Sequence, residues 1–161
     1  ILNSRPLRIA IIGVGRIGEV HARIFHSFGM EIASIVCAKQ CNADRAEKIL
    51  LSNYNIKTSA FTNMDKALDN KIDAVSICSP TQFHYVHILK SLDKGLPIFC
   101  EKPFFWDSNY NLKNIRVKLN HINENYRHNI LVNTSNSNLL DIISNDLPKN
   151  SNGERSLSET E

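Results

Sequence analysis

The sequence has no long apolar run and no strong excess of either charge. None of its apolar runs approaches the roughly 18–20 residues that a transmembrane helix needs, and its first residues lack the charged-then-apolar layout of a secretory signal. Nineteen Lys and Arg side chains against sixteen Asp and Glu leave a formal net charge of +3, scattered along the chain. These absences argue against a membrane protein and against a nucleic acid as partner, and they favour a cytoplasmic protein.

Cysteines are few, and their spacing supports neither a metal site nor a disulfide framework. There are four, and none forms a C-x-x-C pair or stands at a metal-ligand spacing from a histidine. Three of the four lie in or beside apolar runs. We therefore expect buried, reduced thiols and no bound metal at Cys37, Cys41, Cys78 and Cys100.

The length of 161 residues and a hydrophobic content of 42% suit one globular domain with a substantial core. Short apolar runs alternate with stretches in which apolar residues recur at helical spacing. Strands are expected at Leu7–Ile12, Glu31–Cys37, Ser59–Phe61, Ile72–Cys78, Pro97–Cys100 and Asn129–Val132. Helices are expected over Ile17–Phe28, Ala43–Leu51, Met64–Leu68 with Asn63 as cap, a Thr81-capped stretch ending at Gly95, and an Asp107-capped stretch reaching Tyr126. This alternation predicts an α/β fold, a doubly wound parallel sheet of the Rossmann type with about six strands.

The sequence changes character after Asn133. Residues 148–161 are polar, rich in Ser and Asn, and without periodicity, which is typical of disorder. We expect one domain over residues 1–147 and a disordered tail over residues 148–161.

A glycine-rich loop stands where the first expected strand gives way to the first helix. In this G-x-G-x-x-G pattern, Gly13 permits the tight turn, Gly15 lets a pyrophosphate approach the backbone, and Gly18 lets the helix pack closely on the strand. The start of the helix then offers backbone N–H groups to the phosphates. The position of the loop predicts a nucleotide-binding site, although glycines that serve only a tight turn would give the same pattern.

The residues after the second expected strand bear on the choice of dinucleotide. A site selective for NAD usually places Asp or Glu there to hold the ribose hydroxyls, and this chain has Cys37, Ala38 and Lys39 instead. No carboxylate repels a 2′-phosphate, and Lys39 could attract one. The cofactor is therefore expected to be NAD(P), with a lean to NADP, while Lys39 could equally be an ordinary exposed lysine.

Two further motifs follow the fourth and fifth expected strands. They are Ser79-Pro80-Thr81-Gln82-Phe83-His84 and Glu101-Lys102-Pro103. Together with the glycine loop they resemble the N-terminal half of the glucose-fructose oxidoreductase, inositol dehydrogenase and rhizopine-catabolism family (Gfo/Idh/MocA). The resemblance covers roughly residues 7–133, and the three motifs come in the family's order.

The resemblance implies roles for individual residues. The implied cofactor-binding residues are Gly13, Gly15, Arg16, Ile17 and Gly18 at the pyrophosphate, Ser79, Pro80 and His84 beside the cofactor, and Glu101 and Pro103 at the nicotinamide. Lys102 is implied as the catalytic residue, which assists proton movement while the nicotinamide exchanges a hydride with a carbon of a sugar or cyclitol. A lysine at the end of a strand suits this role, since open parallel sheets bind ligands there.

The chain departs from the family in one respect. Members continue into a second domain that holds the substrate, and we expect that domain to be absent here, with a homo-oligomer or a complementing second domain as possible partners. Three explanations stay open: a truncated oxidoreductase, a stand-alone NAD(P)-binding module without catalysis, or a methyltransferase that binds S-adenosylmethionine. The third has no use for Glu101-Lys102-Pro103 and expects an acidic residue where Cys37 stands.

Overall fold

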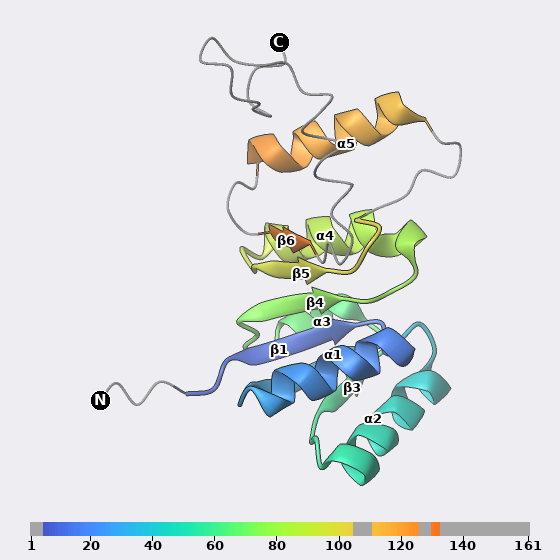
Figure 1. Ribbon diagram of the computed structural model, residues 1–161, viewed down its shortest axis with the longest axis vertical. Helices are drawn as coiled ribbons and strands as arrows, with labels where there is room; N and C mark the ends of the chain where they lie inside the picture. The colour runs from blue at the N-terminus through green and yellow to red at the C-terminus, as the bar shows by residue number, and fades with distance from the viewer. Residues whose placement is uncertain (1–4, 105–110, 126–129, 133–161) are drawn as a thin grey trace.

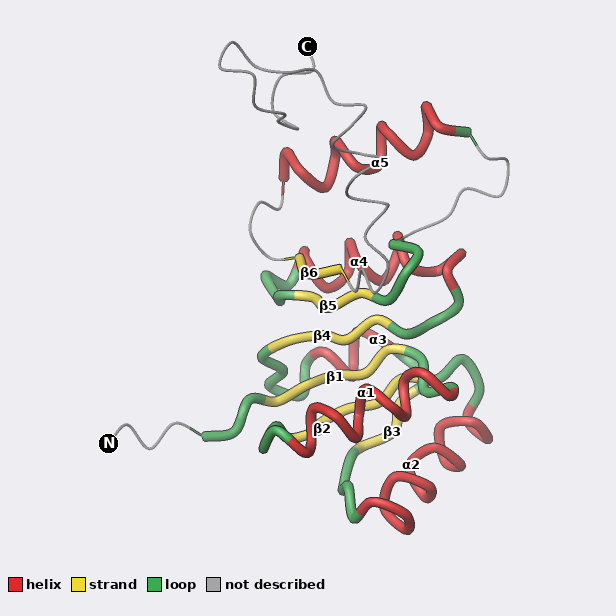
Figure 2. The backbone as a smooth tube through the Cα atoms, in the orientation of Figure 1, coloured by secondary structure: helices red, strands yellow, loops and turns green. Residues whose placement is uncertain are grey.

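The chain forms a parallel β-sheet with helices on both faces (Figures 1 and 2). A computed structural model describes residues 5–104, 111–125 and 130–132. The strands are β1 (Arg8–Ile12), β2 (Glu31–Val36), β3 (Ser59–Phe61), β4 (Ala74–Ile77), β5 (Ile98–Cys100) and β6 (Ile130–Val132). Their order in the sheet is β3-β2-β1-β4-β5-β6, and every neighbouring pair is parallel. The order reverses between β1 and β4, so the expected doubly wound fold is confirmed.

Within the described residues, five helices and one short 3-10 turn accompany the strands. They are α1 (Arg16–Ser27), α2 (Gln40–Tyr54), α3 (Met64–Leu68), η1 (Thr81–Phe83), α4 (His84–Asp93) and α5 (Leu112–Asn125). In Figure 1, α1 and α2 cover one face of the sheet, and α3 and α4 lie behind it. Apolar side chains of α5 pack against the same cluster of buried residues as α3 and α4.

The sheet separates two apolar cores. On β1, Ala10 and Ile12 belong to the core under α3 and α4, whereas Ile9 and Ile11 belong to the core under α1 and α2. Because successive side chains of a strand point to opposite faces, a strand buried on both faces must be apolar throughout. This explains why β1 is apolar from Ile9 to Ile12.

Several expected elements are confirmed. β3 has the predicted bounds, and the side chain of Asn63 caps α3 by accepting a hydrogen bond from the backbone N–H of Lys66 at 3.1 Å. The expectation for Thr81 is wrong: Thr81 begins the 3-10 turn, which has Pro80 at its cap position and no side-chain cap. Asp107, Tyr126 and residues 133–161, with the expected tail and domain boundary, lie outside the described residues.

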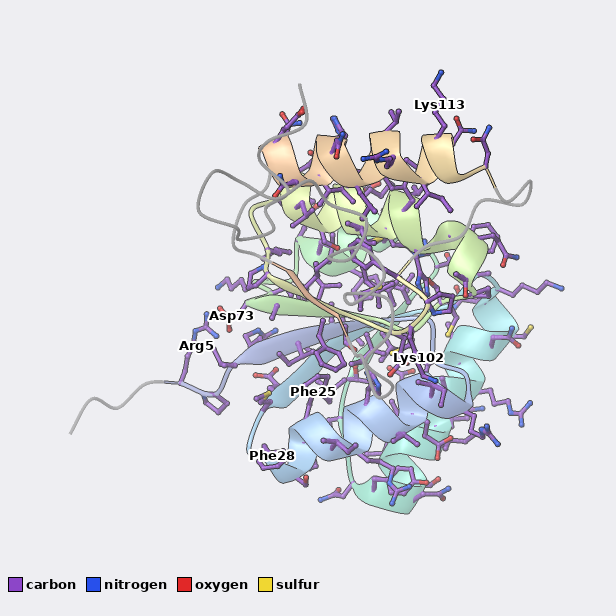
Figure 3. All side chains as sticks on the ribbon, turned by 45° about the horizontal axis from the view of Figure 1, so that its top comes forward. Arg5, Phe25, Phe28, Asp73, Lys102 and Lys113 are labelled. Atoms are coloured by element: carbon purple, nitrogen blue, oxygen red, sulfur yellow. The ribbon has the colours of Figure 1, made fainter. Side chains whose placement is uncertain are left out.

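Several apolar side chains of helix α1 point away from the sheet. Val20 and Ile24 are exposed, as is Phe28, which follows the helix and is 76% exposed, whereas Phe25 is half-buried against the core under α1 and α2 (Figure 3 labels both phenylalanines). The buried residues of the helix are Gly18, His21 and Ala22. The reason is steric, because two small residues on the inner face let the helix lie close to the strands.

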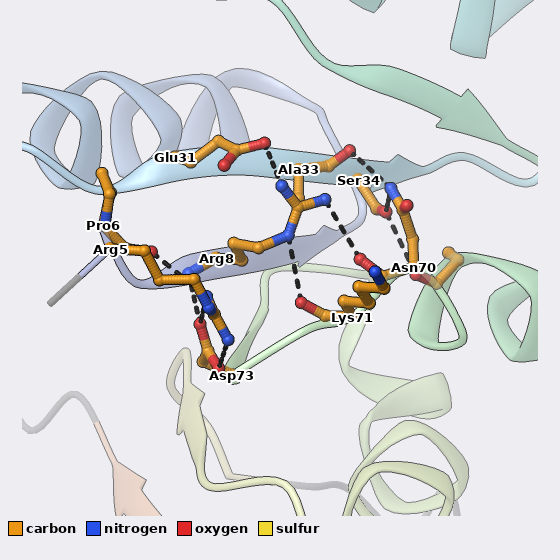
Figure 4. Close-up of polar contacts among 10 residues, drawn as sticks. Arg5, Pro6, Arg8, Glu31, Ala33, Ser34, Asn70, Lys71 and Asp73 are labelled. Atoms are coloured by element: carbon orange, nitrogen blue, oxygen red, sulfur yellow. Dashed lines mark hydrogen bonds and ion pairs between the residues drawn. The ribbon is translucent and has the colours of Figure 1, made fainter.

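A polar network ties the amino ends of the strands together (Figure 4). Arg8 and Asp73 exchange two hydrogen bonds of 2.8 Å: the backbone N–H of Arg8 donates to the Asp73 carboxylate, and the Asp73 N–H donates to the Arg8 carbonyl. The Arg5 guanidinium contacts both Asp73 oxygens, at 2.6 and 2.8 Å, and holds the pKa of that carboxyl below its usual range. Arg8 also pairs with Glu31. This network lies at the end of the sheet opposite the glycine loop and leaves the other end to the site.

Within the described ranges, no helix is both long enough and apolar enough to cross a membrane.

Candidate functional site

The carboxyl ends of β1, β2 and β4 open onto a cleft of about 810 Å³. Its walls are the glycine loop with the start of α1, the loop after β2 with α2, and the loop after β4. The predicted site residues that line it are Gly13, Gly15, Arg16, Ile17, Cys37, Ser79 and Pro80. The structure therefore brings together residues from three separate motifs.

The three glycines of the loop have different surroundings. Gly13 has φ +89°, and a Cβ there would stand 2.6 Å from the backbone of Ser79. A Cβ at Gly18 would stand 2.1 Å from the carbonyl oxygen of Gly13. At Gly15 a Cβ would meet nothing within 4 Å. Gly13 and Gly18 are thus required by the fold itself, whereas Gly15 faces free space.

Helix α1 begins at this free space. Gly15 is its N-cap, and the first hydrogen bond within the helix runs from the Glu19 N–H to the Gly15 carbonyl at 3.0 Å. The N–H groups of the residues before Glu19 have no partner within the helix. No side chain caps this end. A helix start of this kind attracts an anion through its N–H groups and its dipole.

At the loop after β2, the basic residue that lines the cleft is Arg45 and not Lys39, which the sequence suggested. Cys37 is buried, its N–H donates to the Phe61 carbonyl at 3.0 Å, and burial raises the pKa of its thiol. Lys39 is exposed at the N-cap position of α2 and is not among the residues that line the cleft. Asn42 and Arg45, from the first turns of α2, line it instead. Asn42 and Arg45 are three residues apart on a helix, which places them on the same face of α2. This spacing was a signal that sequence reasoning missed.

A second cavity of about 460 Å³ adjoins the first. The two share the residues Gly13, Cys37, Ala38, Ser79 and Pro80. Its other walls come mainly from the start of α3 and from η1 and α4.

Ser79 and His87 form a polar pair at this second cavity. Ser79 Oγ lies 2.8 Å from His87 Nδ1. Burial, assisted by the nearby His84 and Lys90, lowers the pKa of His87 to about 4. The ring is therefore neutral near pH 7, and its hydrogen bond fixes the Ser79 hydroxyl at the junction of the two cavities.

His84 lies in the interior rather than at the surface of either cavity. It is 1% exposed. Its Nε2 is 2.7 Å from the Ser79 carbonyl oxygen, and its Nδ1 is 3.0 Å from the carbonyl oxygens of Pro103 and Phe104. The ring thus joins the loop after β4 to the loop after β5. It is separated from solvent and from the cleft, so it acts on both loops through their backbones.

Glu101, Lys102 and Pro103 follow β5 at the same end of the sheet. The Glu101 N–H donates to the Ile77 carbonyl at 2.9 Å, which continues the pairing of β4 with β5. Glu101 Oε1 lies 2.8 Å from His21 Nε2, and Oε2 accepts the backbone N–H of Lys102 at 3.2 Å. Lys102 and Pro103 are exposed. Figure 3 shows Lys102 at the opposite end of the sheet from Arg5 and Asp73.

His21 is a further member of the site that the sequence did not single out. Its partners, Ser76 and Glu101, are 55 and 80 residues away along the chain. The available signal was a polar residue between Gly18 and Ala22, on the face of α1 where small residues mark close packing.

Comparison with known proteins agrees with this geometry. Residues 7–118 match the sequence model GFO_IDH_MocA, described as an oxidoreductase family with an NAD-binding Rossmann fold. D-glucoside 3-dehydrogenase of Escherichia coli is 35% identical over 103 residues, which are 63% of this chain and 28% of that protein. Inositol 2-dehydrogenase of Pseudarthrobacter chlorophenolicus is 32% identical over 119 residues, 72% of this chain and 34% of that protein.

Solved structures give the same relationship. Scyllo-inositol dehydrogenase from Lactobacillus casei, solved with bound cofactor NAD(H) and scyllo-inositol, superposes with a TM-score of 0.64 at 25% identity. The superposition covers 80% of this chain and 36% of that one. The chain thus spans about a third of the length of the proteins it resembles.

Proposed function

The chain belongs to the GFO_IDH_MocA oxidoreductase family and carries its NAD-binding Rossmann fold, and on that premise we propose that it is the cofactor-binding part of a sugar or cyclitol dehydrogenase. The observation that carries the proposal is the free space at Gly15, at the start of α1 and on the wall of the cleft. A cofactor's pyrophosphate fits this space, since backbone N–H groups and the helix dipole both favour negative charge there.

The adenosine half of the dinucleotide is assigned to the two adjoining cavities. Cys37 and Ala38 would hold the ribose next to the pyrophosphate, and the second cavity, beside Ser79 and Pro80, would hold the adenine. The apolar side chains Ile12, Met64 and Val86 in the wall of that cavity suit the faces of a purine.

We propose that NADP(H) binds more tightly than NAD(H). Cys37, Ala38 and Lys39 follow β2, so no carboxylate at this point accepts hydrogen bonds from a free ribose 2′-hydroxyl or repels a 2′-phosphate. Arg45 supplies a guanidinium on the cleft wall. A guanidinium binds a phosphate group through paired, charge-assisted hydrogen bonds, and Lys39 adds positive charge nearby.

The nicotinamide end is assigned to the loop after β5. When bound there, the nicotinamide accepts or returns a hydride. Lys102, exposed at the end of the strand, would donate a hydrogen bond to the reacting oxygen of a secondary alcohol or carbonyl and so assist the movement of its proton. Glu101 holds the backbone of Lys102 in place. The substrate class rests on the named activities of the relatives, which act on a glucoside and on inositol.

The experiment that tests this proposal is a titration of the protein with NADH and with NADPH, followed through nicotinamide fluorescence. Binding of at least one dinucleotide is expected. A flat titration with both would contradict the proposal.

A further inference from the structure

We propose that His21 is a positioning residue. It holds the Glu101 carboxylate and, through that carboxylate, the backbone of Lys102. In this way it couples the start of α1 to the nicotinamide end of the site. The inference rests on the proposed function, because that function gives Glu101 and Lys102 their place. No contact between His21 and the cofactor is involved.

His21 is enclosed by the protein. It is 8% exposed, and on α1, all of whose residues are described, it is the one buried residue with a polar side chain. The rings of Phe25 and Phe99 pack edge-on against it, with centroids 6.0 and 5.3 Å away. A buried polar group in such apolar surroundings is costly unless both of its nitrogens find partners.

Both ring nitrogens do find partners, and the partners come from different elements. Nε2 lies 2.8 Å from Glu101 Oε1, and Nδ1 lies 2.8 Å from Ser76 Oγ and 3.2 Å from Cys78 Sγ. An ionised carboxylate only accepts, so Nε2 carries the hydrogen and donates it to Glu101. In the neutral ring, Nδ1 is then the acceptor for the Ser76 hydroxyl or for the Cys78 thiol, which stays protonated because burial raises its pKa to about 12.

The second carboxylate oxygen of Glu101 links His21 to the backbone of Lys102. While Oε1 is held by His21, Oε2 accepts the backbone N–H of Lys102 at 3.2 Å. With one oxygen held on each side, the carboxylate cannot rotate without breaking a hydrogen bond. The orientation of the Lys102 backbone therefore depends on the ring of His21.

Helix α1 therefore contributes to both the pyrophosphate end and the nicotinamide end of the proposed site. Its first turn faces the cleft at the glycine loop, and one turn later His21 reaches across the sheet to the loop after β5. The distance between the pyrophosphate and nicotinamide subsites is thereby set by one rigid helix.

The experiment separates the two halves of the cofactor. Affinity is measured for the tighter binder of NADH and NADPH, and for ADP-ribose or its 2′-phosphate, which lack the nicotinamide. In His21→Asn the shorter amide reaches Ser76 but not Glu101, whereas in His21→Gln the longer amide reaches Glu101. We expect His21→Asn to weaken dinucleotide binding about tenfold and to leave ADP-ribose binding within about twofold, and His21→Gln to restore most of the loss.

The inference would be overturned if His21→Asn weakened the binding of both ligands equally, or if it left the ratio of their two affinities unchanged. If the wild-type protein bound neither ligand, the proposed function would fail first, which is a distinguishable result. A second measurement does not depend on a folded variant: in the wild-type protein, the ¹⁵N resonances of the His21 ring should shift on addition of the dinucleotide and stay in place with ADP-ribose. Equal shifts with both ligands would also overturn the inference.

Discussion

Gly18 lies so close to Gly13 that a Cβ added at Gly18 would stand 2.1 Å from the Gly13 carbonyl oxygen. Real Cβ atoms do not approach backbone this closely, and neither segment has a flexible end that could move aside. The close contact holds the start of α1 against the end of β1. It is therefore a property of the fold, and it is present with or without a bound nucleotide.

Replacement of Gly18 by Ala is expected to lower the free energy of unfolding by about 2–3 kcal/mol, because the added methyl group forces α1 away from the loop. Urea denaturation measures the change. Gly15→Ala is the matched control, since its Cβ meets nothing within 4 Å, and a loss of no more than about 1 kcal/mol is expected from its N-cap position. Equal destabilisation by both variants would show that the steric account of the loop is wrong.

Stability should fall in mild acid because of His87. Its pKa is about 4 in the folded protein against a usual 6.5, so between these values the unfolded state binds more protons. The contribution of the neutral ring is complete above about pH 6.5 and is lost as the pH falls toward 4. Urea midpoints measured across this range should decline, and the decline should be smaller in His87→Asn. A variant with the same slope as the wild-type protein would exclude His87 as the cause.

Only one of the four thiols should react readily in the folded protein. Cys41 is exposed on α2, so the expectation of a buried thiol is wrong there, whereas burial raises the pKa of Cys37, of Cys78 to about 12, and of Cys100. Alkylation with iodoacetamide near neutral pH should add one group, at Cys41, and urea should expose the other three. The Cys41→Ser variant serves as control and should add none. Mass spectrometry showing labelling of Cys78 as rapid as that of Cys41 would contradict the burial of that loop.

The choice between dinucleotides should depend on Arg45. Arg45→Gln is expected to weaken NADPH binding about five- to tenfold and to leave NADH binding within about twofold, because only NADPH carries the 2′-phosphate. Lys39→Gln, at an exposed position outside the cleft wall, should have a smaller effect. Tighter binding of NADH than of NADPH by the wild-type protein would refute the proposed preference, and equal loss of both ligands in Arg45→Gln would refute the role of Arg45.

Local patterns in the sequence were sufficient to predict the elements of the fold. The alternation of apolar runs with helical spacing located β3 and the Asn63-capped α3, and the glycine loop fell between β1 and α1 as predicted. The spacing on α1 predicted a helix but not which side of it faces the sheet. Close packing at Gly18 decided that question and left Phe28 exposed.

The site was less predictable because its contacts are long-range. The hydrogen bond between His21 and Glu101 joins residues 80 apart in the sequence, and that between His84 and Pro103 joins residues 19 apart. Neither bond can be predicted from the spacing of residues within one helix or strand. The motif at residues 79–84 predicted a histidine beside the cofactor, and the structure places that ring inside the protein, between two loops.

The central claim is that the free space at Gly15 receives the cofactor's pyrophosphate, and the most direct test is the affinity of Gly15→Leu for NADH and NADPH. A side chain at Gly15 starts in open space, so the variant should fold, and loss of the N-cap glycine should lower its melting temperature by only about a few degrees. Ser27→Ala, at the far end of α1, is the control for substitution in this helix. We predict at least a tenfold loss of dinucleotide affinity in Gly15→Leu and none in Ser27→Ala. Undiminished binding by a folded Gly15→Leu variant would contradict the assignment of the site.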